Sequence, residues 1–305
     1  AFLQLVSQSD AMRTVIEFVG DRPRQKIVHD FSYELEILDF SNKENKKHFL
    51  KNWIDNQSQK IFDLSKRLFD SALIKMGENR YVWFLKQHHL ITDGWSKTIQ
   101  YNVLSEYYQA LLLQKDMENF TIPRFENYIK EESAKRLNQN PQIKSYWQEL
   151  ANRLPSSDAL YGKNNQNRDT HSERVIIKLT KEKVDQIRKL TQEPDIRAWT
   201  MDLSLFNIFG TLLFALMSKL SGQEEMTFGT PVHNRSNVSF RNTPGLFIEL
   251  FPLSVSVKNK DSFSTLFNRV QESSFNFLKH AQTGASSVSL IKSFNTVLNY
   301  INVGF

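Results

Sequence analysis

The sequence predicts an α/β fold built from two lobes. Segments with strand-like and helix-like patterns alternate along all 305 residues. The run at residues 81–85, Tyr-Val-Trp-Phe-Leu, is apolar and aromatic throughout, which is typical of a buried central strand. A polar stretch at 156–172 divides the chain into parts of about 150 residues, each large enough to bury a core of its own. Alternating strands and helices of this kind define the α/β class.

The first lobe is predicted to span residues 1–155. Its first residues have helix-like spacing and lead into an apolar strand at 15–18, and the turn at 21–24 precedes two further strands within 25–39. Residues 42–69 are polar, with apolar residues at helical spacing, which predicts one or two surface helices.

The rest of the first lobe is predicted to be mainly helical. After the central strand, apolar residues recur at three- and four-residue spacing. We therefore expect an amphipathic helix that begins near Ser96, because serine is a good N-cap residue. Two more helices are expected over 124–134 and 138–154.

Residues 156–172 are rich in Ser, Asn, Asp and Gly and are predicted to form a crossover linker. The second lobe is expected over 173–305, with Asp202 and Asp261 as helix N-caps. Its predicted elements are, in order, a strand at 174–179, a helix at 181–190, a buried helix at 203–220, a strand at 226–229, a long loop at 229–245, a strand at 250–257 and a helix at 263–279.

The composition excludes several classes of function. The chain has no Cys, so disulfides, thiolate metal sites and Cys nucleophiles are ruled out, and a reducing cytoplasm is the expected location. The N-terminus has no signal-peptide pattern, and the apolar stretch at 203–217 is too short to span a membrane. The net charge of +6 comes from scattered residues, so we expect no nucleic-acid partner, although a basic surface suits an acidic protein.

The sequence His-His-Leu-Ile-Thr-Asp-Gly at 88–94 follows the predicted central strand directly. Two adjacent His in extended backbone point to opposite faces, so only one of His88 and His89 can serve a given cavity. Asp93 lies across the turn, where it can cap the following helix or pair with a buried Arg. Gly94 permits backbone angles that other residues resist. The pattern alone is equally compatible with two interpretations. One is a functional His, and the other is a packed core His followed by an Asp that simply caps the helix.

Two other kinds of site are disfavoured. Consecutive His residues cannot chelate a metal from one face of a strand, and no third ligand lies at a suitable spacing. No G-x-S-x-G is present, so a Ser–His–Asp hydrolase lacks its nucleophile elbow.

Residues 88–96, HHLITDGWS, resemble the HHxxxDG signature of the condensation domains of nonribosomal peptide synthetases, in the chloramphenicol-acetyltransferase-like superfamily. Five other segments match family motifs in the same order, so the resemblance spans nearly the whole chain. They are AMRTVIEF at 11–18 (ALRTxF), FENY at 125–128 (xDY), SYW at 145–147 (xYW), GTPVHNR at 229–235 (GxPVxxR) and GLFIELFPL at 245–253 (GxFVNTxPL).

The chain departs from the family pattern at three points. Residues 8–10 are Gln-Ser-Asp where the family has RHE, and Glu249 stands where the family has Asn, so no role of that Asn is carried over. The chain also starts after the family's first motif and stops before its last ones, which predicts an incompletely covered domain.

The resemblance implies two chloramphenicol-acetyltransferase-like lobes in a V shape with an active-site tunnel between them. It implies that His89 is the catalytic residue, and we expect the backbone N–H of Gly94 close to the developing oxyanion.

Residues that support the site are also implied. His88 is expected to pack, and Asp93 to be the structural partner of an Arg. Arg13 is the first candidate for that Arg and Arg235 the second, because a buried carboxylate is tolerated only when it is paired.

The implied reaction joins a carrier-bound acyl or aminoacyl thioester to a carrier-bound amine as an amide. No tightly bound cofactor is expected, because donor and acceptor carrier proteins bring the substrates on phosphopantetheine arms, beside adjacent synthetase domains. Alternatives are a free-standing acyltransferase with a soluble amine or alcohol acceptor, and an inactive docking platform. An epimerisation domain is disfavoured because Trp95 and Ser96 replace its usual continuation, and the double-Asp pattern of heterocyclisation domains is absent.

Overall fold

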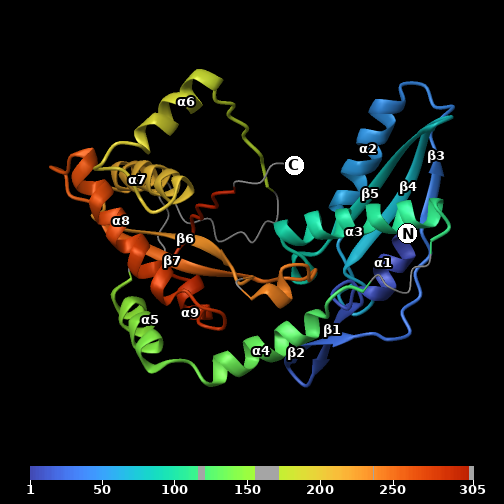
Figure 1. Cartoon of the computed structure of the whole chain (residues 1–305), viewed down its shortest axis with the longest axis horizontal. Helices are drawn as coiled ribbons and strands as arrows, with labels where there is room; N and C mark the ends of the chain where they lie inside the picture. The colour runs from blue at the N-terminus through green and yellow to red at the C-terminus, as the bar shows by residue number, and fades with distance from the viewer. Residues whose placement is uncertain (116–120, 155–171, 236, 302–305) are drawn as a thin grey trace. The chain divides into compact units, whose positions relative to one another are not determined.

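The computed structural model describes residues 1–115, 121–154, 172–235 and 237–301. It divides into two compact units, which Figure 1 shows in one view. The first unit contains Ala1–Ser133 and Asn234–Ile248, and the second contains Ala134–His233 and Glu249–Phe305. The units do not follow the boundaries predicted from composition. The predicted linker lies outside the described residues except for Ser172, and the segment 234–248 joins the first unit because its side chains pack there.

In the described part of the first unit, three helices and five strands precede α4, and two short 3-10 helices are also present. Its elements are α1 (Phe2–Gln8), β1 (Thr14–Val19), β2 (Arg22–Ile27), β3 (Glu36–Asp39), α2 (Lys46–Gln59), β4 (Phe69–Gly77), β5 (Arg80–Gln87), η1 (His89–Ile91), α3 (Gly94–Leu112), most of α4 (Phe125–Leu137) and η2 (Val238–Phe240).

The sheet that carries the double His has the order β3-β4-β5, with β3 parallel and β5 antiparallel to β4. The strand predicted at 81–85 is present, but the prediction that it is buried and central is wrong. β5 is half-buried and lies at one edge of the described sheet, and β4 is its centre. β4 was missed, because residues 70–80 were assigned to no helix or strand, and the helix predicted within 42–69 ends at Gln59. Its alternating burial shows the two-residue period of a strand.

Adjacent residues of β5 face opposite sides of this sheet, as strand geometry requires. Trp83 joins the core that contains α1 and α3 residues, and the Phe2 ring meets it edge-on at 5.8 Å. Phe84 joins the core on the other side, where Trp53 of α2 packs edge-on at 5.0 Å. Helices thus cover both faces of the sheet that ends in the motif (Figure 1).

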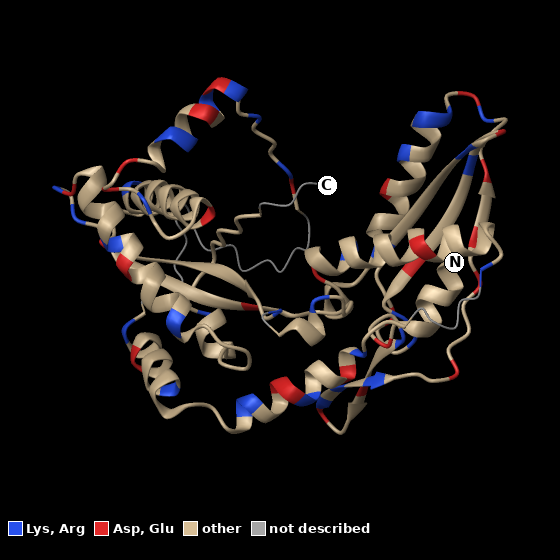
Figure 2. Cartoon of the chain, in the orientation of Figure 1, with Lys and Arg blue, Asp and Glu red and all other residues tan. Residues whose placement is uncertain are grey.

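The second unit contains a two-stranded sheet with helices. Its elements are α5 (Pro141–Arg153), α6 (Lys181–Leu190), α7 (Met201–Ser221), β6 (Glu225–His233), β7 (Ile248–Ser256, whose first residue is grouped with the first unit), α8 (Phe263–His280) and α9 (Val288–Ile291). β6 pairs with β7, and a parallel bridge joins Gly229 to Val297. Lys, Arg, Asp and Glu interleave along α4 and α6 (Figure 2), in line with the scattered charge of the sequence.

Three sequence expectations fail in the second unit. Residues 174–179 form no strand, and Val175 and Ile177 are more than four-fifths exposed, because no pairing strand lies beside them in the described part of the chain. The N-cap of α7 is Thr200, two residues before the predicted Asp202. The N-cap of α8 is Ser262, one residue after the predicted Asp261.

Helix α7 is longer than the sequence predicted. It has 21 residues with a mean hydropathy of 1.6 over its most apolar stretch, so by length and composition alone it could cross a membrane. Its buried face packs into the core of the second unit, where the rings of Phe214 and Phe228 stack at 4.4 Å. These contacts agree with the predicted buried helix.

Candidate active site

His88 has a structural role at the end of β5. It caps η1, and its Nδ1 accepts a hydrogen bond of 3.1 Å from the backbone N–H of Leu90. An accepting Nδ1 places the proton of the neutral ring on Nε2. The ring is half-buried and meets Phe62 edge-on at 6.1 Å. His88 therefore holds the turn that follows β5.

His89 is the first residue of η1, and its side chain is exposed. No hydrogen bond reaches its imidazole within the described ranges of the chain. The sequence argument expected the two imidazoles to separate because of extended backbone. The structure separates them through a 3-10 turn instead. The His89 ring is the more exposed of the two.

Gly94 is the first residue of α3, so this helix begins two residues before the predicted Ser96. The expected unusual backbone angle is wrong, because the φ of Gly94 is not positive. A Cβ built at this position meets no atom within 4 Å. At the first helical position the N–H has no partner in the helix. Gly94 thus lies in open space at the N-terminus of α3, where its N–H has no partner within the helix.

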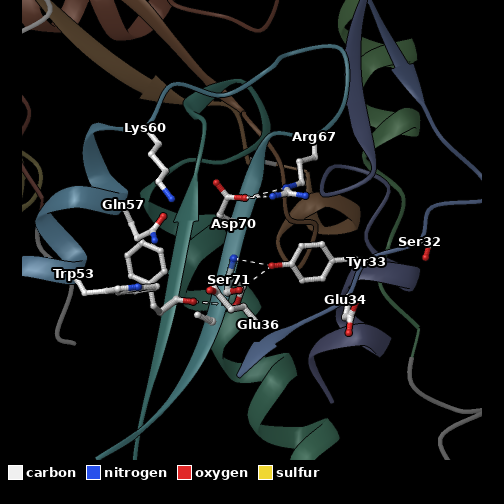
Figure 3. A pocket seen from close by; sticks show the side chains of 12 residues that line it. Ser32, Tyr33, Glu34, Glu36, Trp53, Gln57, Lys60, Arg67, Asp70 and Ser71 are labelled. Atoms are coloured by element: carbon white, nitrogen blue, oxygen red, sulfur yellow. Dashed lines mark hydrogen bonds and ion pairs between the residues drawn. The ribbon is translucent and has the colours of Figure 1, made fainter. Parts of the chain in front are cut away.

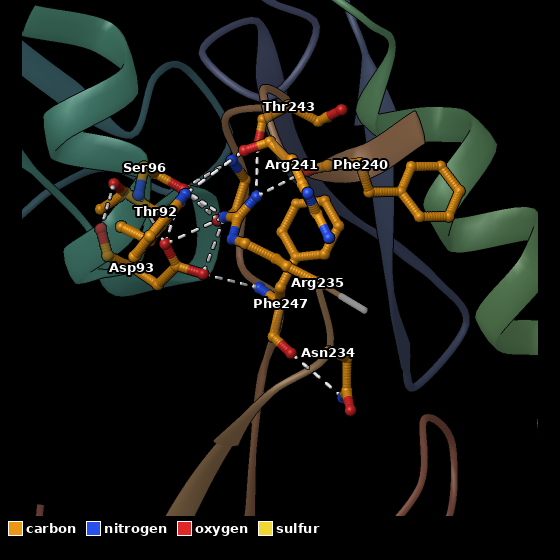
Figure 4. Close-up of polar contacts among 11 residues, drawn as sticks. Thr92, Asp93, Ser96, Asn234, Arg235, Phe240, Arg241, Thr243 and Phe247 are labelled. Carbon is orange, nitrogen blue, oxygen red and sulfur yellow. Dashed lines mark hydrogen bonds and ion pairs between the residues drawn. The ribbon is translucent and has the colours of Figure 1, made fainter. Parts of the chain in front are cut away.

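Asp93 is the N-cap of α3 and is fully buried together with Arg235 (Figure 4). The Arg235 Nη2 lies 3.0 Å from both carboxylate oxygens. Asp93 Oδ1 also accepts from the backbone N–H and the hydroxyl of Ser96, both at 2.7 Å, and Oδ2 accepts from the N–H of Phe247 at 3.1 Å. The carboxylate is therefore held by donors from two segments about 140 residues or more apart in sequence.

Backbone carbonyls of the loop after β6 complete the surroundings of Arg235. Its Nη1 donates to Phe240 O at 3.1 Å and to Thr243 O at 2.6 Å, and its guanidinium lies 3.7 Å from the centre of the Phe247 ring. Burial lowers the pKa of Arg235, and the Asp93 carboxylate acts in the opposite direction. The cation is tolerated inside the unit because carbonyl oxygens and one carboxylate surround it.

The order of the two candidate arginines is therefore reversed. Arg13, the first candidate, donates from Nη1 to Val28 O at 2.8 Å and is half-buried beside β2. It serves the β1–β2 hairpin, and Arg235 is the partner of Asp93. Sequence distance could not rank them, because Arg235 reaches Asp93 only through a loop that extends from β6.

Ser96 is a site residue that the sequence argument assigned wrongly. Its hydroxyl accepts from Arg235 Nη2 and from the N–H of Gly245, both at 2.9 Å. Its single proton faces Asp93 Oδ1 at 2.7 Å and Gly245 O at 2.6 Å. A serine three residues after an N-cap Asp occupies the position where side chains reach back to the cap, and this spacing was the available signal.

Asp10 explains how another departure from the family pattern is accommodated. This buried carboxylate accepts from the backbone N–H groups of Phe125 and Glu126, both at 2.9 Å, and so caps α4 from a distant part of the chain. Phe125 in turn lies directly against Gly245, where any Cβ would overlap its ring. The segments that resemble family motifs thus contact one another within the first unit.

Glu249, the substitution for the family Asn, lies in the second unit and binds backbone. Its Oε1 accepts from Gly284 N–H at 2.7 Å and its Oε2 from Ser286 N–H at 3.1 Å. The carboxylate thus holds the loop after α8 through two oxygens. An Asn has a shorter side chain and only one oxygen to accept hydrogen bonds.

A separate cavity of about 390 Å³ opens on the first unit beside β4 (Figure 3). Arg67 pairs with Asp70 at 2.7 Å and stacks over Tyr33 at 5.7 Å. The Tyr33 hydroxyl accepts from the N–H of Ser71 and donates to its carbonyl, both at 2.8 Å. These groups tie residues 32–36 to β4, and no residue of the 88–94 motif lines this cavity.

The fold and the site together define an α/β domain with an HHxxxDG centre. The chain matches the Condensation domain family over residues 1–296, and it belongs to that family. The resemblance inferred from the motifs is confirmed. No group of three or more His, Asp or Glu residues suited to a metal ion is present in the described part of the chain.

Curated relatives are much longer proteins. The chain is 24% identical to surfactin synthase subunit 1 of Bacillus subtilis over 283 residues, which are 92% of this chain and 7% of that protein. It is 25% identical to gramicidin S synthase 2 of Aneurinibacillus migulanus over 279 residues, which are 89% of this chain and 6% of that protein. The chain therefore corresponds to a small part of each synthase.

Solved structures share the fold. The first condensation domain of the calcium-dependent antibiotic synthetase, in complex with substrate analogue 2a, matches with a TM-score of 0.72 and 18% identity over 97% of this chain and 70% of that chain. A variant of the starter condensation domain of rhizomide synthetase in complex with C8-CoA matches with a TM-score of 0.74 and 18% identity, over 98% of this chain and 68% of that chain. The α/β class is confirmed, and the V shape with its tunnel stays a prediction.

Proposed function

We propose that this domain forms an amide bond between a carrier-bound acyl or aminoacyl thioester and a carrier-bound amine. The observation that carries the proposal is the contrast within the motif. The His89 imidazole is exposed and unbonded, while the turn beneath it is anchored by His88 and by the buried Asp93–Arg235 pair. An exposed imidazole on a rigidly held turn suits catalysis more than packing.

In the proposed reaction the amine nitrogen attacks the thioester carbonyl carbon, the new C–N bond forms and the C–S bond breaks. The nitrogen proton passes to the His89 imidazole and from there to the departing thiolate, which leaves as a thiol. An α-amino group has an ordinary pKa near 7.7–8, so about a tenth is already neutral at pH 7. The base therefore needs only modest strength, as imidazole offers.

The oxyanion of the tetrahedral intermediate needs a donor, and we propose the N–H of Gly94 for this role. It is the first N–H of the 19-residue helix α3, where the helix dipole favours negative charge. The absence of a side chain at Gly94 keeps this N–H accessible.

The partners follow from the same proposal. Donor and acceptor carrier proteins would deliver their substrates on phosphopantetheine arms, beside adjacent synthetase domains in the cytoplasm. The curated relatives are peptide synthases, and two solved relatives were obtained with a substrate analogue and with C8-CoA, which supports an acyl donor.

The test is amide formation between a donor-loaded and an acceptor-loaded carrier protein, followed by mass spectrometry of the acceptor carrier. His89→Ala is expected to lower the rate at least a hundredfold with an unchanged circular dichroism spectrum. His88→Ala, the matched control, is expected mainly to lower thermal stability. Full product from His89→Ala would remove this residue from the mechanism.

Two arms of the same assay separate the alternatives. Product with a soluble amine and no acceptor carrier would identify a free-standing acyltransferase. Retention of loaded carriers on the immobilised domain without turnover would identify a docking platform.

A further inference from the structure

The second unit contains a cavity of about 510 Å³ that the proposed reaction does not use. It lies where the N-terminus of α7, the end of β6 and the C-terminal half of α8 meet residues 299 and 300. This volume is within the range of small-molecule sites, which are mostly apolar with a few placed polar groups. Its apolar lining consists of Leu203, Phe206, Pro231, Val232, Phe277 and Leu278.

One buried hydroxyl of the cavity wall makes no hydrogen bond within the described part of the chain. It belongs to Ser274 of α8, which is 1% exposed. A helical serine ordinarily returns its hydroxyl to the carbonyl four residues earlier, as Thr211 does to Asn207 in α7. Buried hydroxyls without any partner are rare in folded proteins, so this one points to a ligand atom.

The charges around the cavity restrict the ligand. Asp202 is the only Asp, Glu, Lys or Arg among the described residues of the lining, and it is exposed at the rim, where it accepts from the Tyr300 hydroxyl at 3.1 Å. The described lining contains no Lys or Arg to receive a carboxylate, its one imidazole belongs to His233, which is exposed at the end of β6, and Asp202 repels an anion. A buried charge without a partner is strongly unfavourable.

We propose that this cavity binds an uncharged amphiphile, an aliphatic or aromatic chain that carries one amide, carbonyl or hydroxyl group. The chain would contact the apolar wall, and the polar group would hydrogen-bond to the Ser274 hydroxyl. The site belongs to the second unit alone, and its occupancy does not depend on the His89 reaction.

The test is isothermal titration of the protein with three probes of equal chain length, octanamide, octanoate and octylamine. Octanamide is expected to bind most tightly. Ser274→Ala keeps the cavity and removes the hydroxyl, so it is expected to weaken octanamide three- to tenfold. Val232→Trp is expected to fill the cavity and abolish binding of octanamide.

Ser264→Ala is the matched control, because Ser264 is exposed on the same helix. Absence of octanamide binding to the parent protein, equal affinity of the Ser274→Ala variant, or tighter binding of either charged probe would each overturn the proposal. Thermal unfolding of Ser274→Ala separates a folding defect from a lost contact. The titration involves no turnover, so its failure and that of amide formation are distinguishable.

Discussion

Replacement of Arg235 by Met tests the buried pair that supports the candidate active site. The substitution keeps most of the side-chain volume and removes the guanidinium. Asp93 loses its cationic partner, and the carbonyls of Phe240 and Thr243 lose their buried donor. The carboxylate keeps three donors, namely the N–H and hydroxyl of Ser96 and the N–H of Phe247.

The size of the effect follows from these contacts. Removal of one partner from a buried ion pair destabilises a protein by about 3–5 kcal/mol. The three remaining donors to Asp93 place Arg235→Met toward the lower part of that range. Arg13→Met is the matched control, since Arg13 makes one hydrogen bond and is half-buried. Loss of a single such bond corresponds to about 0.5–1.5 kcal/mol.

Amide hydrogen exchange read by mass spectrometry is the suitable assay, because a chain with two units need not unfold in one step. Peptides that cover residues 234–248 and 92–100 report the pair directly. We expect the free energy of local opening in both to fall by about 3 kcal/mol in Arg235→Met. Arg13→Met should leave them almost unchanged.

Two results would refute this reasoning. One is a loss under 1 kcal/mol in Arg235→Met, and the other is an equal effect of Arg13→Met. The double variant Asp93→Asn with Arg235→Met gives a further check. It should be less destabilised than the sum of the single variants, because it leaves no unpaired charge buried.

Three further predictions concern other contacts. Gly245→Ala should destabilise the first unit by about 1–3 kcal/mol in the same exchange assay, because the new Cβ overlaps the Phe125 ring. Hydrogen bonds from Arg269 hold the pKa of Asp261 to about 2, below its ordinary 3.8. This pair therefore stabilises the fold fully above about pH 4, and its contribution is lost as the pH falls through 2. In Asp261→Asn the melting temperature should consequently fall less between pH 4 and pH 2 than it does in the parent protein. Glu249→Gln should leave one backbone N–H of the loop after α8 unpaired and speed its exchange.

Each of these outcomes has a control or a contrary result. Gly94→Ala introduces the same methyl group into open space, so its stability should match the parent while Gly245→Ala falls. Coincident acid profiles for the parent and Asp261→Asn would contradict the pKa argument. Unchanged exchange after α8 in Glu249→Gln would show that one oxygen suffices for both N–H groups.

Local patterns were sufficient for the setting of the motif. The apolar run in β5 and the helical spacing that follows it predicted a strand, a turn and a helix around 88–94, and these elements are present. β4 was not predicted. The sequence analysis assigned residues 70–77 to no helix or strand, and the structure forms a strand there that pairs with β3 and β5.

The start of α3 shows a second kind of error. The sequence placed the cap at Ser96, a favourable residue, whereas Asp93 occupies the cap and Ser96 turns its hydroxyl toward Arg235. Both residue types suit an N-cap, so propensity could not choose between them. The choice depends on a guanidinium delivered from residue 235.

The sequence by itself was enough for the family and the α/β class, because ordered motifs along the chain carry that information. The spacing of one short segment also selected His88, His89 and Asp93 as candidate site residues. Only the tertiary structure decided which arginine neutralises Asp93, which strand is central and that the Ser274 hydroxyl is buried without a partner among the described residues. These outcomes depend on contacts between residues far apart in the chain. Such contacts are selected by burial and by the satisfaction of buried polar groups, which no local pattern encodes.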